Sequence, residues 1–267
     1  MTDARLPAAY LSAGGTSFAA FLREVNPEAL PRAEGLPGAA ADLAPHGTTI
    51  VALASRDSLI MAGDRRATFG HLIASRDMEK VFVTAEHSLA GIAGSAGVGI
   101  ELIRLFRVEL EHYEKIEGVG MSLQGQANRL AAMVRANLSL AMQGLAAVPV
   151  FGGYDRSRDQ VRLWSFDATG GSYAEREHLS IGSGSLAARG ALKKLWRPGL
   201  TTPEALSVAI EALYDAADDD TATGGPDLAR GIWPTIAIAD EQGARFIATD
   251  EVSAIVAEVL ARREAPR

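Results

Sequence analysis

The chain contains no cysteine among its 267 residues. Disulfide bonds, thiolate metal sites and a cysteine nucleophile are therefore excluded. This absence is typical of a protein from a reducing cytoplasm, which is where we expect the chain to be found. Hydrophobic residues make up 48% of the chain and charged residues 22%, so a single globular domain of this length can bury a core without such cross-links.

Long runs of one residue type are also missing. The net charge is −7 and no long basic run appears, so we expect no binding of nucleic acid through its phosphates. No apolar stretch reaches the roughly 20 residues that a membrane-spanning helix needs. We expect no metal site, because the five histidines lack zinc-type spacing and Asp218-Asp219-Asp220 lacks the other ligands of a calcium loop.

The first 47 residues differ from the rest. They contain prolines at 27, 31, 37 and 45, with small residues between these positions. No sustained helical or strand-like pattern of apolar residues is present in this segment. Such a composition predicts a flexible leader over residues 1–47, followed by one folded domain over 48–267.

From Thr49 onward the hydrophobic pattern predicts alternating groups of strands and helices. Strands are expected at 49–55, 58–62, 81–84, 88–93, 148–154, 161–166, 233–239 and 244–248. Helices are expected from about 100 to Gly118, from Ser122 through Met142, over 186–196, from Pro203, and from Glu251. Paired helices between antiparallel strand pairs favour sheets stacked between helical layers, an α/β layered fold.

Gly47-Thr48-Thr49 stands where the leader meets the first strand. Cleavage between Gly47 and Thr48 would place a free α-amine beside the threonine hydroxyl. An α-amine has a reference pKa of about 7.7–8, so it can act as a base near neutral pH and activate that hydroxyl. Taken alone, a Thr-Thr pair is more typical of an ordinary strand, because threonine favours strands.

Two charged residues follow at regular distances. Asp64 comes 16 residues after Thr48, and Lys80 comes 16 residues after Asp64. Each is expected at a strand end, where side chains from neighbouring strands can converge. A lysine buried beside an aspartate would lower the pKa of a nearby hydroxyl and α-ammonium. Taken singly, Asp64 is more typical of a turn and Lys80 of a solvated surface.

Together these segments resemble the β-subunits of the 20S proteasome, which are N-terminal nucleophile hydrolases. Their amino-acid sequence is most similar to that of actinobacterial members. The resemblance extends from Thr48 to about Ala261. It is carried by segments 47–52, 62–68, 78–80, 91–97, 182–185 and 220–225. It implies a four-layer αββα sandwich, with two antiparallel sheets between helical layers, and a threonine endopeptidase that needs no cofactor and no metal.

The resemblance also implies roles for individual residues. Thr48 would be the nucleophile and, through its amine, the general base, with Gly47 and Thr48 forming the autocatalytic processing site. Lys80, held by Asp64, would lower the pKa of the hydroxyl. A hydrogen-bonded cluster around the amine would be formed by Ser183, Asp220 and Thr223, and at position 223 the family usually has serine. Gly94 would supply a backbone N–H to the oxyanion hole. The substrate would be bound by Ala67, Thr68, Met78, Ile92 and Ala96.

The family assembles as a barrel. The resemblance implies heptameric rings of β-subunits between rings of proteasome α-subunits, with the sites facing a closed chamber. Unfolded protein substrates would be fed in by an ATPase ring, and actinobacterial systems also mark substrates with a small protein tag.

Two other functions stay open at this point. The Gly-rich segments 94–99 and 182–185 each precede a helix, where a nucleotide or sugar phosphate could bind, although neither has the spacing of a known phosphate-binding loop. A non-catalytic proteasome-type structural subunit would share the fold, but such α-type subunits lack this set of Thr, Asp and Lys. A Ser-His-Asp hydrolase would need a G-x-S-x-G segment, which is missing.

Overall fold

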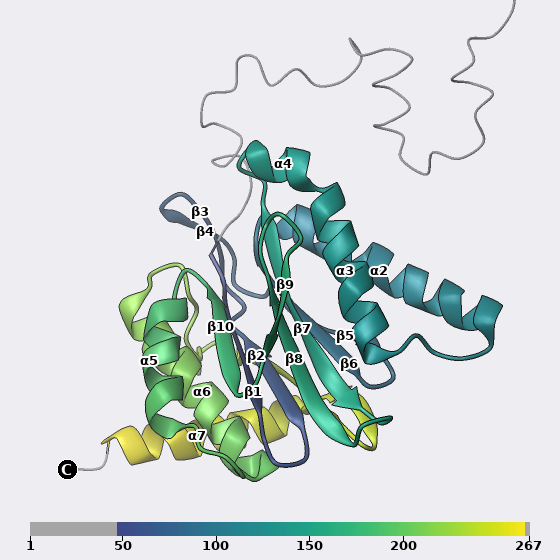
Figure 1. The fold of residues 1–267 in the computed structure, drawn as a ribbon. Coiled ribbons are helices and arrows are strands. Elements are labelled where there is room, and N and C mark those ends of the chain that lie inside the picture. Colours follow the sequence, from purple (N-terminus) through teal and green to yellow (C-terminus); the bar gives the residue numbers. More distant parts are fainter. Residues whose placement is uncertain (1–46, 265–267) are drawn as a thin grey trace, which may run out of the picture. The chain divides into compact units, whose positions relative to one another are not determined.

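The computed structural model describes residues 47–264. Apart from Gly47, the expected leader lies outside the described residues. Two five-stranded antiparallel sheets form the centre of this domain (Figure 1). The first has the order β10-β1-β2-β11-β12 and comprises β1 (Thr49–Ala54), β2 (Leu59–Gly63), β10 (His178–Gly182), β11 (Thr235–Asp240) and β12 (Gly243–Phe246). The second has the order β5-β6-β7-β8-β9 and comprises β5 (Val81–Ala85), β6 (Ser88–Gly94), β7 (Ala147–Asp155), β8 (Gln160–Phe166) and β9 (Ser172–Glu175).

Helices cover the outer face of each sheet. The second sheet is covered by α2 (Ala96–Glu117) and α3 (Leu123–Ala136), with the short α4 (Leu138–Met142) after them. The first sheet is covered by α5 (Ser185–Leu195), α6 (Thr202–Asp219) and α7 (Thr249–Glu264). Among the helices that the structure describes, none is both long and apolar enough to cross a membrane. The arrangement confirms the layered αββα fold.

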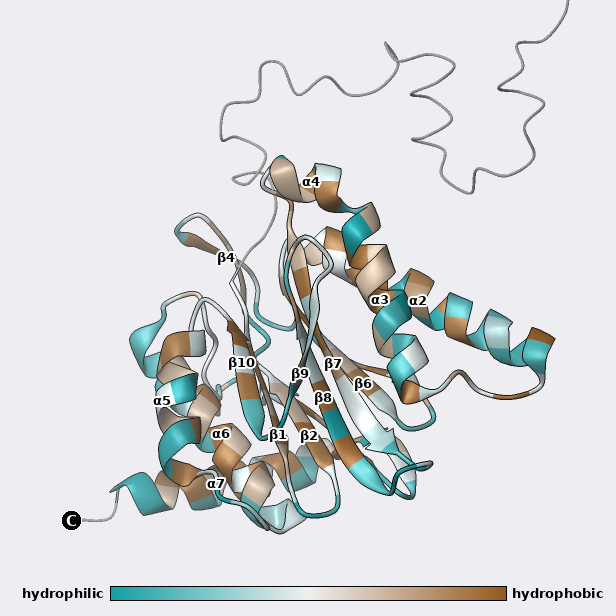
Figure 2. Ribbon diagram, viewed as in Figure 1, coloured by the Kyte–Doolittle hydropathy of each residue, from teal (hydrophilic) through white to brown (hydrophobic). Residues whose placement is uncertain are grey.

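Three hydrophobic cores correspond to the three interfaces between these layers. Alternate side chains of β1 point to opposite faces, as in any strand. Val51 and Leu53 therefore pack against the helices, whereas Ile50 and Ala52 pack between the sheets, and all four are fully buried. Burial on both faces explains why β1 is an almost continuous hydrophobic run, visible in Figure 2.

Several expected elements match within one or two residues, and the differences are informative. The helix expected to run through Met142 ends earlier, because Asn137 leaves the helical conformation, and Met142 is 83% exposed. Four short strands were not expected from the sequence. They are β9, β10 and the two strands of a small separate hairpin, β3 (Ala67–Phe69) and β4 (Leu72–Ser75).

Candidate active site

Three strand ends bring Thr48, Asp64 and Lys80 together. Thr48 directly precedes β1, Asp64 directly follows β2, and Lys80 directly precedes β5. The register pairs Ile50 with Gly63, so the end of β2 lies beside the start of β1. The β5 strand belongs to the other sheet, and it reaches the same place because its first residue packs in the core between the two sheets.

Lys80 and Asp64 form a buried ion pair. The Lys80 Nζ donates to Asp64 Oδ1 at 2.7 Å, and the two side chains are 2% and 0% exposed. Lys80 also donates to the carbonyl oxygen of Gly47 at 3.0 Å and to that of Arg66. An ammonium group has three protons to donate, so all three are used. A solvated surface lysine, the ordinary alternative for Lys80, is thereby excluded.

Burial sets the direction of the pKa change at Lys80. Desolvation lowers the pKa of Lys80 below its usual value of 10.5, and the charge and hydrogen bond of Asp64 oppose this without cancelling it. The positive charge of Arg66 adds to the lowering. The ammonium therefore releases its proton more readily than an exposed lysine does.

The carboxylate of Asp64 is surrounded by donors. Oδ1 accepts the N–H of Thr49 at 2.8 Å besides the Lys80 ammonium. Oδ2 accepts the N–H groups of Arg66 and Gly224, both at 2.9 Å. A buried charge is tolerated only where its hydrogen-bonding positions are filled, and here four donors fill them.

The structure distinguishes the two adjacent threonines. The Thr48 Oγ1 lies 2.6 Å from the carbonyl oxygen of Gly47, to which it donates. The Thr49 Oγ1 is instead hydrogen-bonded to Thr223 Oγ1 at 2.6 Å and accepts the N–H of Gly184 at 3.1 Å. Of these two hydroxyls, that of Thr48 is thus the one placed beside the peptide bond between Gly47 and Thr48.

A second polar cluster is connected to Thr48 through Ser183. Asp220 Oδ2 accepts the hydroxyls of Ser183 at 2.5 Å and Thr223 at 2.6 Å. Ser183 is connected to Thr48 by its N–H, which donates to the Thr48 carbonyl at 2.9 Å. Burial acts to raise the pKa of Asp220, but the hydrogen bonds outweigh it, and the pKa lies below its usual value. The threonine at 223 therefore makes the hydroxyl bond despite its extra methyl group.

Gly94 is the last residue of β6 and is exposed. Its φ of +101° is unfavourable for other residues, and a Cβ there would lie 2.3 Å from the carbonyl oxygen of Ala146. The need for glycine at this position therefore follows from the backbone itself. The role of the Gly94 N–H in an oxyanion hole stays a prediction.

The residues expected to bind substrate lie in two environments. Ala67 and Ile92 are buried, whereas Thr68, Met78 and Ala96 are partly exposed. Backbone hydrogen bonds connect some of them to the site: Ile92 N–H donates to the Lys80 carbonyl at 3.0 Å, and Met78 N–H donates to that of Arg65 at 2.9 Å. The Ile92 side chain itself belongs to the core beneath α2 and α3. Their convergence on one substrate pocket stays a prediction.

The Gly-rich loop at 182–185 does not form an open anion cradle. The N–H of Ser183 donates to Thr48 and that of Gly184 to Thr49, so both are used within the protein. This weakens the phosphate-binding alternative for that loop. Within residues 47–264, no group of three or more His, Asp or Glu side chains is arranged to hold a metal ion.

Sequence reasoning missed three contributors to the site. Thr49 supplies both an N–H and a hydroxyl, Arg66 supplies an N–H and a carbonyl, and Gly224 supplies an N–H. All three lie inside the segments that carry the family resemblance. Their part in the site runs mainly through backbone groups, which residue type does not reveal.

Comparisons with known proteins identify the family of the chain. A family model described as "Proteasome subunit" matches residues 44–227. The chain is 55% identical to a proteasome subunit beta of Acidothermus cellulolyticus over 266 residues, which cover 98% of this chain and 92% of the relative. It is 52% identical to a proteasome subunit beta of Streptomyces griseus subsp. griseus over 260 residues, covering 97% and 92%. The chain therefore belongs to the proteasome subunit family, among its β-subunits.

Proposed function

We propose that this β-subunit is a threonine-type endopeptidase with Thr48 as its nucleophile. One observation carries the proposal. Two groups contact the Gly47 carbonyl oxygen, the Thr48 hydroxyl at 2.6 Å and the Lys80 ammonium at 3.0 Å, and Asp64 holds that ammonium at 2.7 Å. A nucleophile beside a carbonyl whose oxygen accepts a hydrogen bond from a cation is the arrangement that acyl transfer needs.

The first reaction is removal of residues 1–47 by the chain itself. The Thr48 Oγ1 attacks the carbonyl carbon of Gly47, and the Lys80 ammonium stabilises the charge that develops on the carbonyl oxygen. The C–N bond breaks as the proton of the hydroxyl passes to the nitrogen, which leaves Gly47 as an ester on Thr48. Water hydrolyses this ester, releases the leader with a carboxylate at Gly47, and regenerates the Thr48 hydroxyl beside the α-amine that breakage of the C–N bond has freed.

Turnover of substrates then uses the new amine. It takes the proton of the Thr48 hydroxyl during attack and passes it to the leaving amine, and water hydrolyses the acyl-enzyme. Lys80 lowers the pKa of the hydroxyl, and Ser183, Asp220 and Thr223 hold the amine. The N–H of Gly94 stabilises the oxyanion. Ala67, Thr68, Met78, Ile92 and Ala96 bind the substrate.

Family membership implies assembly into a proteasome core with other subunits. We further propose heptameric β-rings between α-rings, with the Thr48 sites facing a closed chamber in the cytoplasm. Unfolded proteins are the substrates, delivered by an ATPase ring and marked in some cases by a small protein tag. Native mass spectrometry of the chain with its matching α-subunit tests the ring size.

The test of the catalytic role compares Thr48→Ala with Thr48→Ser, each co-expressed with the matching α-subunit. Serine keeps the hydroxyl, so that variant should lose the leader and cleave peptides at a measurable rate. Alanine should keep residues 1–47 by intact mass and show no peptidase activity. Trimming to an N-terminus at residue 48 in the alanine variant would overturn self-processing, and full peptidase activity there would indicate another nucleophile.

A further inference from the structure

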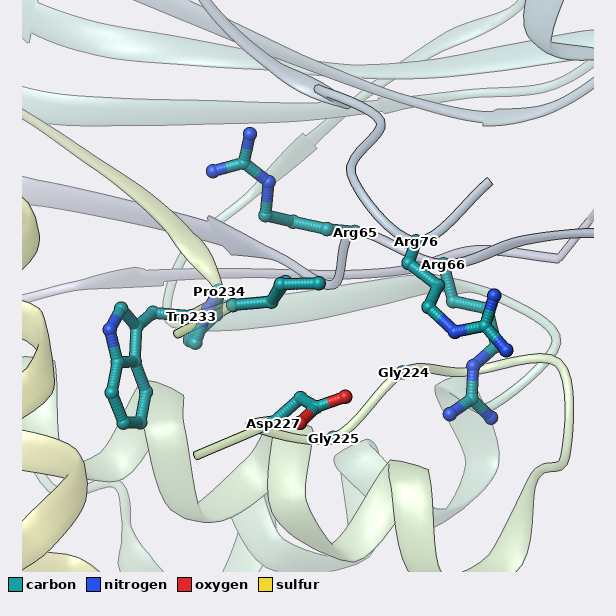
Figure 3. A pocket seen from close by; sticks show the side chains of 9 residues that line it. Arg65, Arg66, Arg76, Gly224, Gly225, Asp227, Trp233 and Pro234 are labelled. Carbon is teal, nitrogen blue, oxygen red and sulfur yellow. The ribbon is translucent and has the colours of Figure 1, made fainter. Parts of the chain in front are cut away.

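A pocket rich in arginine lies beside the active site. Three arginines line it: Arg65 and Arg66 from the loop after β2, and Arg76 from the loop after β4. Gly224 and Gly225, in the loop after α6, form another wall. In Figure 3 the side chains of Arg66 and Arg76 extend in the same direction past Gly224, whereas Arg65 points away from them.

Within residues 47–264, neither Arg66 nor Arg76 forms an ion pair with a carboxylate, although the charge of Arg66 helps to lower the pKa of Asp220 from a distance. Arg76 is exposed and makes no ion pair or side-chain hydrogen bond with any residue in the described range 47–264. Arg66 donates one N–H to the carbonyl of Thr221 at 3.0 Å, a neutral acceptor. Two guanidinium groups in one pocket repel each other unless an anion lies between them.

The other charged groups are already paired. Among the described residues, Asp227 is the one carboxylate of the lining, and its Oδ2 accepts a hydrogen bond from Arg230 at 2.8 Å. Arg65 forms an ion pair with Asp77. Neither pair removes the charge of Arg66 or Arg76, although the chain as a whole is acidic, with a net charge of −7.

We propose that this pocket binds a carboxylate group, held by the guanidinium groups of Arg66 and Arg76. The cavity has a volume of about 30 Å³. About 10–15 Å³ is enough for one water molecule, so a group of two or three heavy atoms fits. Guanidinium groups bind planar carboxylates through paired N–H donors, which matches the chemistry of the two side chains.

Arg66 connects this pocket to the active site. Its N–H donates to Asp64, and its carbonyl accepts from Lys80. After the larger effect of burial, the charge of Arg66 contributes to the lowered pKa of Lys80. A bound carboxylate offsets that charge, so occupancy of the pocket alters the field at the catalytic lysine.

The binding test uses [1-¹³C]acetate as the probe and the wild-type full-length chain. Transverse relaxation of the carboxylate carbon should increase on addition of protein and saturate with acetate concentration. The variant Arg76→Gln keeps the fold, because Arg76 is exposed and has no partner in the described part of the chain, and it should weaken binding at least fivefold. Arg104→Gln is the matched control, since Arg104 on α2 is 77% exposed and should leave binding unchanged.

A relaxation effect that does not saturate, or that is equal in the two variants, overturns the proposal. The same measurement on the particle assembled with α-subunits identifies the source of the carboxylate. Retained acetate binding assigns the site to a free small carboxylate. Acetate binding that is lost on assembly and restored by disassembly assigns it to an acidic side chain of a neighbouring subunit. Both results keep the carboxylate site.

Discussion

The hydroxyl oxygens of Thr49 and Thr223 lie 2.6 Å apart and are hydrogen-bonded to each other. The bond ties the first residue of β1 to the loop that carries Asp220. Thr49 is fully buried, and its hydroxyl also accepts the N–H of Gly184. Of the two adjacent threonines, the second therefore connects elements of the site, and the first is the one that we propose as the nucleophile.

Replacing Thr49 by valine should leave the cleavage position unchanged. Thr49→Val keeps the shape but leaves the buried N–H of Gly184 without its acceptor, which costs about 1–3 kcal/mol of unfolding free energy. Intact mass should still give an N-terminus at Thr48, and urea denaturation should show the loss of stability. Thr48→Val is the control, which should stay uncut. A folded Thr49→Val chain that retains its leader would contradict the assignment.

Asp64 and Lys80 should contribute unequally to stability. Lys80→Ala leaves the Asp64 carboxylate with three N–H donors, so we expect a loss of only about 1–3 kcal/mol. Asp64→Ala leaves the buried ammonium and three N–H groups without their carboxylate acceptor. The free energy of unfolding should therefore fall by about 3–5 kcal/mol. Urea denaturation in a Thr48→Ala background, where every chain keeps its leader, compares the two. Equal losses would mean that the backbone donors do not support the carboxylate.

The pH dependence of catalysis should show the lowered pKa of Lys80. The rate requires the ammonium form, which is lost as pH rises through its pKa, so kcat/KM should fall at a pH below the usual 10.5. On the acid side the rate should fall as the α-amine, with a reference pKa of about 7.7–8, becomes protonated. Assembled particles assayed with a fluorogenic peptide should give this bell-shaped profile. Lys80→Arg should be at least tenfold less active, because a planar guanidinium does not replace a compact ammonium.

Gly182→Ala should displace Thr48, the proposed nucleophile. Gly182 pairs with Thr49 across β10 and β1, has a φ of +101°, and a Cβ there would lie 1.9 Å from the Thr48 carbonyl oxygen. A shift of about 1 Å can cost roughly a hundredfold in rate, so the leader should be removed about that much more slowly. Gly190→Ala in α5 is the matched control, because nothing lies within 4 Å of the added Cβ. Processing of both variants at the wild-type rate would show that this contact does not position Thr48.

Cleavage should favour peptides with an apolar or small neutral residue on the acyl side of the bond. The predicted pocket residues Ala67, Met78, Ile92 and Ala96 carry no charge, so a charged side chain would be desolvated without a partner. Met78 is flexible enough to admit different shapes, and the preference should be broad. Fluorogenic peptides ending in Leu, Tyr, Phe, Arg and Glu measure it on assembled particles. Faster cleavage after Arg or Glu would contradict the pocket while leaving the threonine mechanism intact.

The sequence predicted the elements that have a strong pattern. The runs of β1 and β2 are apolar because both faces are buried, and both strands were expected from that pattern. The β10 strand was missed because five residues, His178–Gly182, give little periodicity, although Leu179 and Ile181 do alternate with polar neighbours. The hairpin of β3 and β4 is shorter still, and Leu72 and Ile73 are exposed, so no burial pattern marks it.

The candidate site was predictable only in part, for a similar reason. The spacing of Thr48, Asp64 and Lys80 indicated the three residues once the family was recognised, and they do converge. The N–H groups that hold Asp64 come from Thr49, Arg66 and Gly224, of which the last lies 160 residues further along the chain. Such contacts depend on how the loops meet after folding. Because every residue other than proline has a backbone N–H, the residue type does not indicate which of these groups will bind Asp64.

The position of β1 has a consequence for when its amides can exchange with solvent. The strand is bonded on both edges, to β10 and β2, and is covered on both faces. A segment enclosed in this way can open only when the whole domain unfolds, so its amide protons should exchange last. Thr48 is thus attached to the part of the domain that we expect to exchange most slowly, so the geometry of the proposed nucleophile should persist between one reaction and the next.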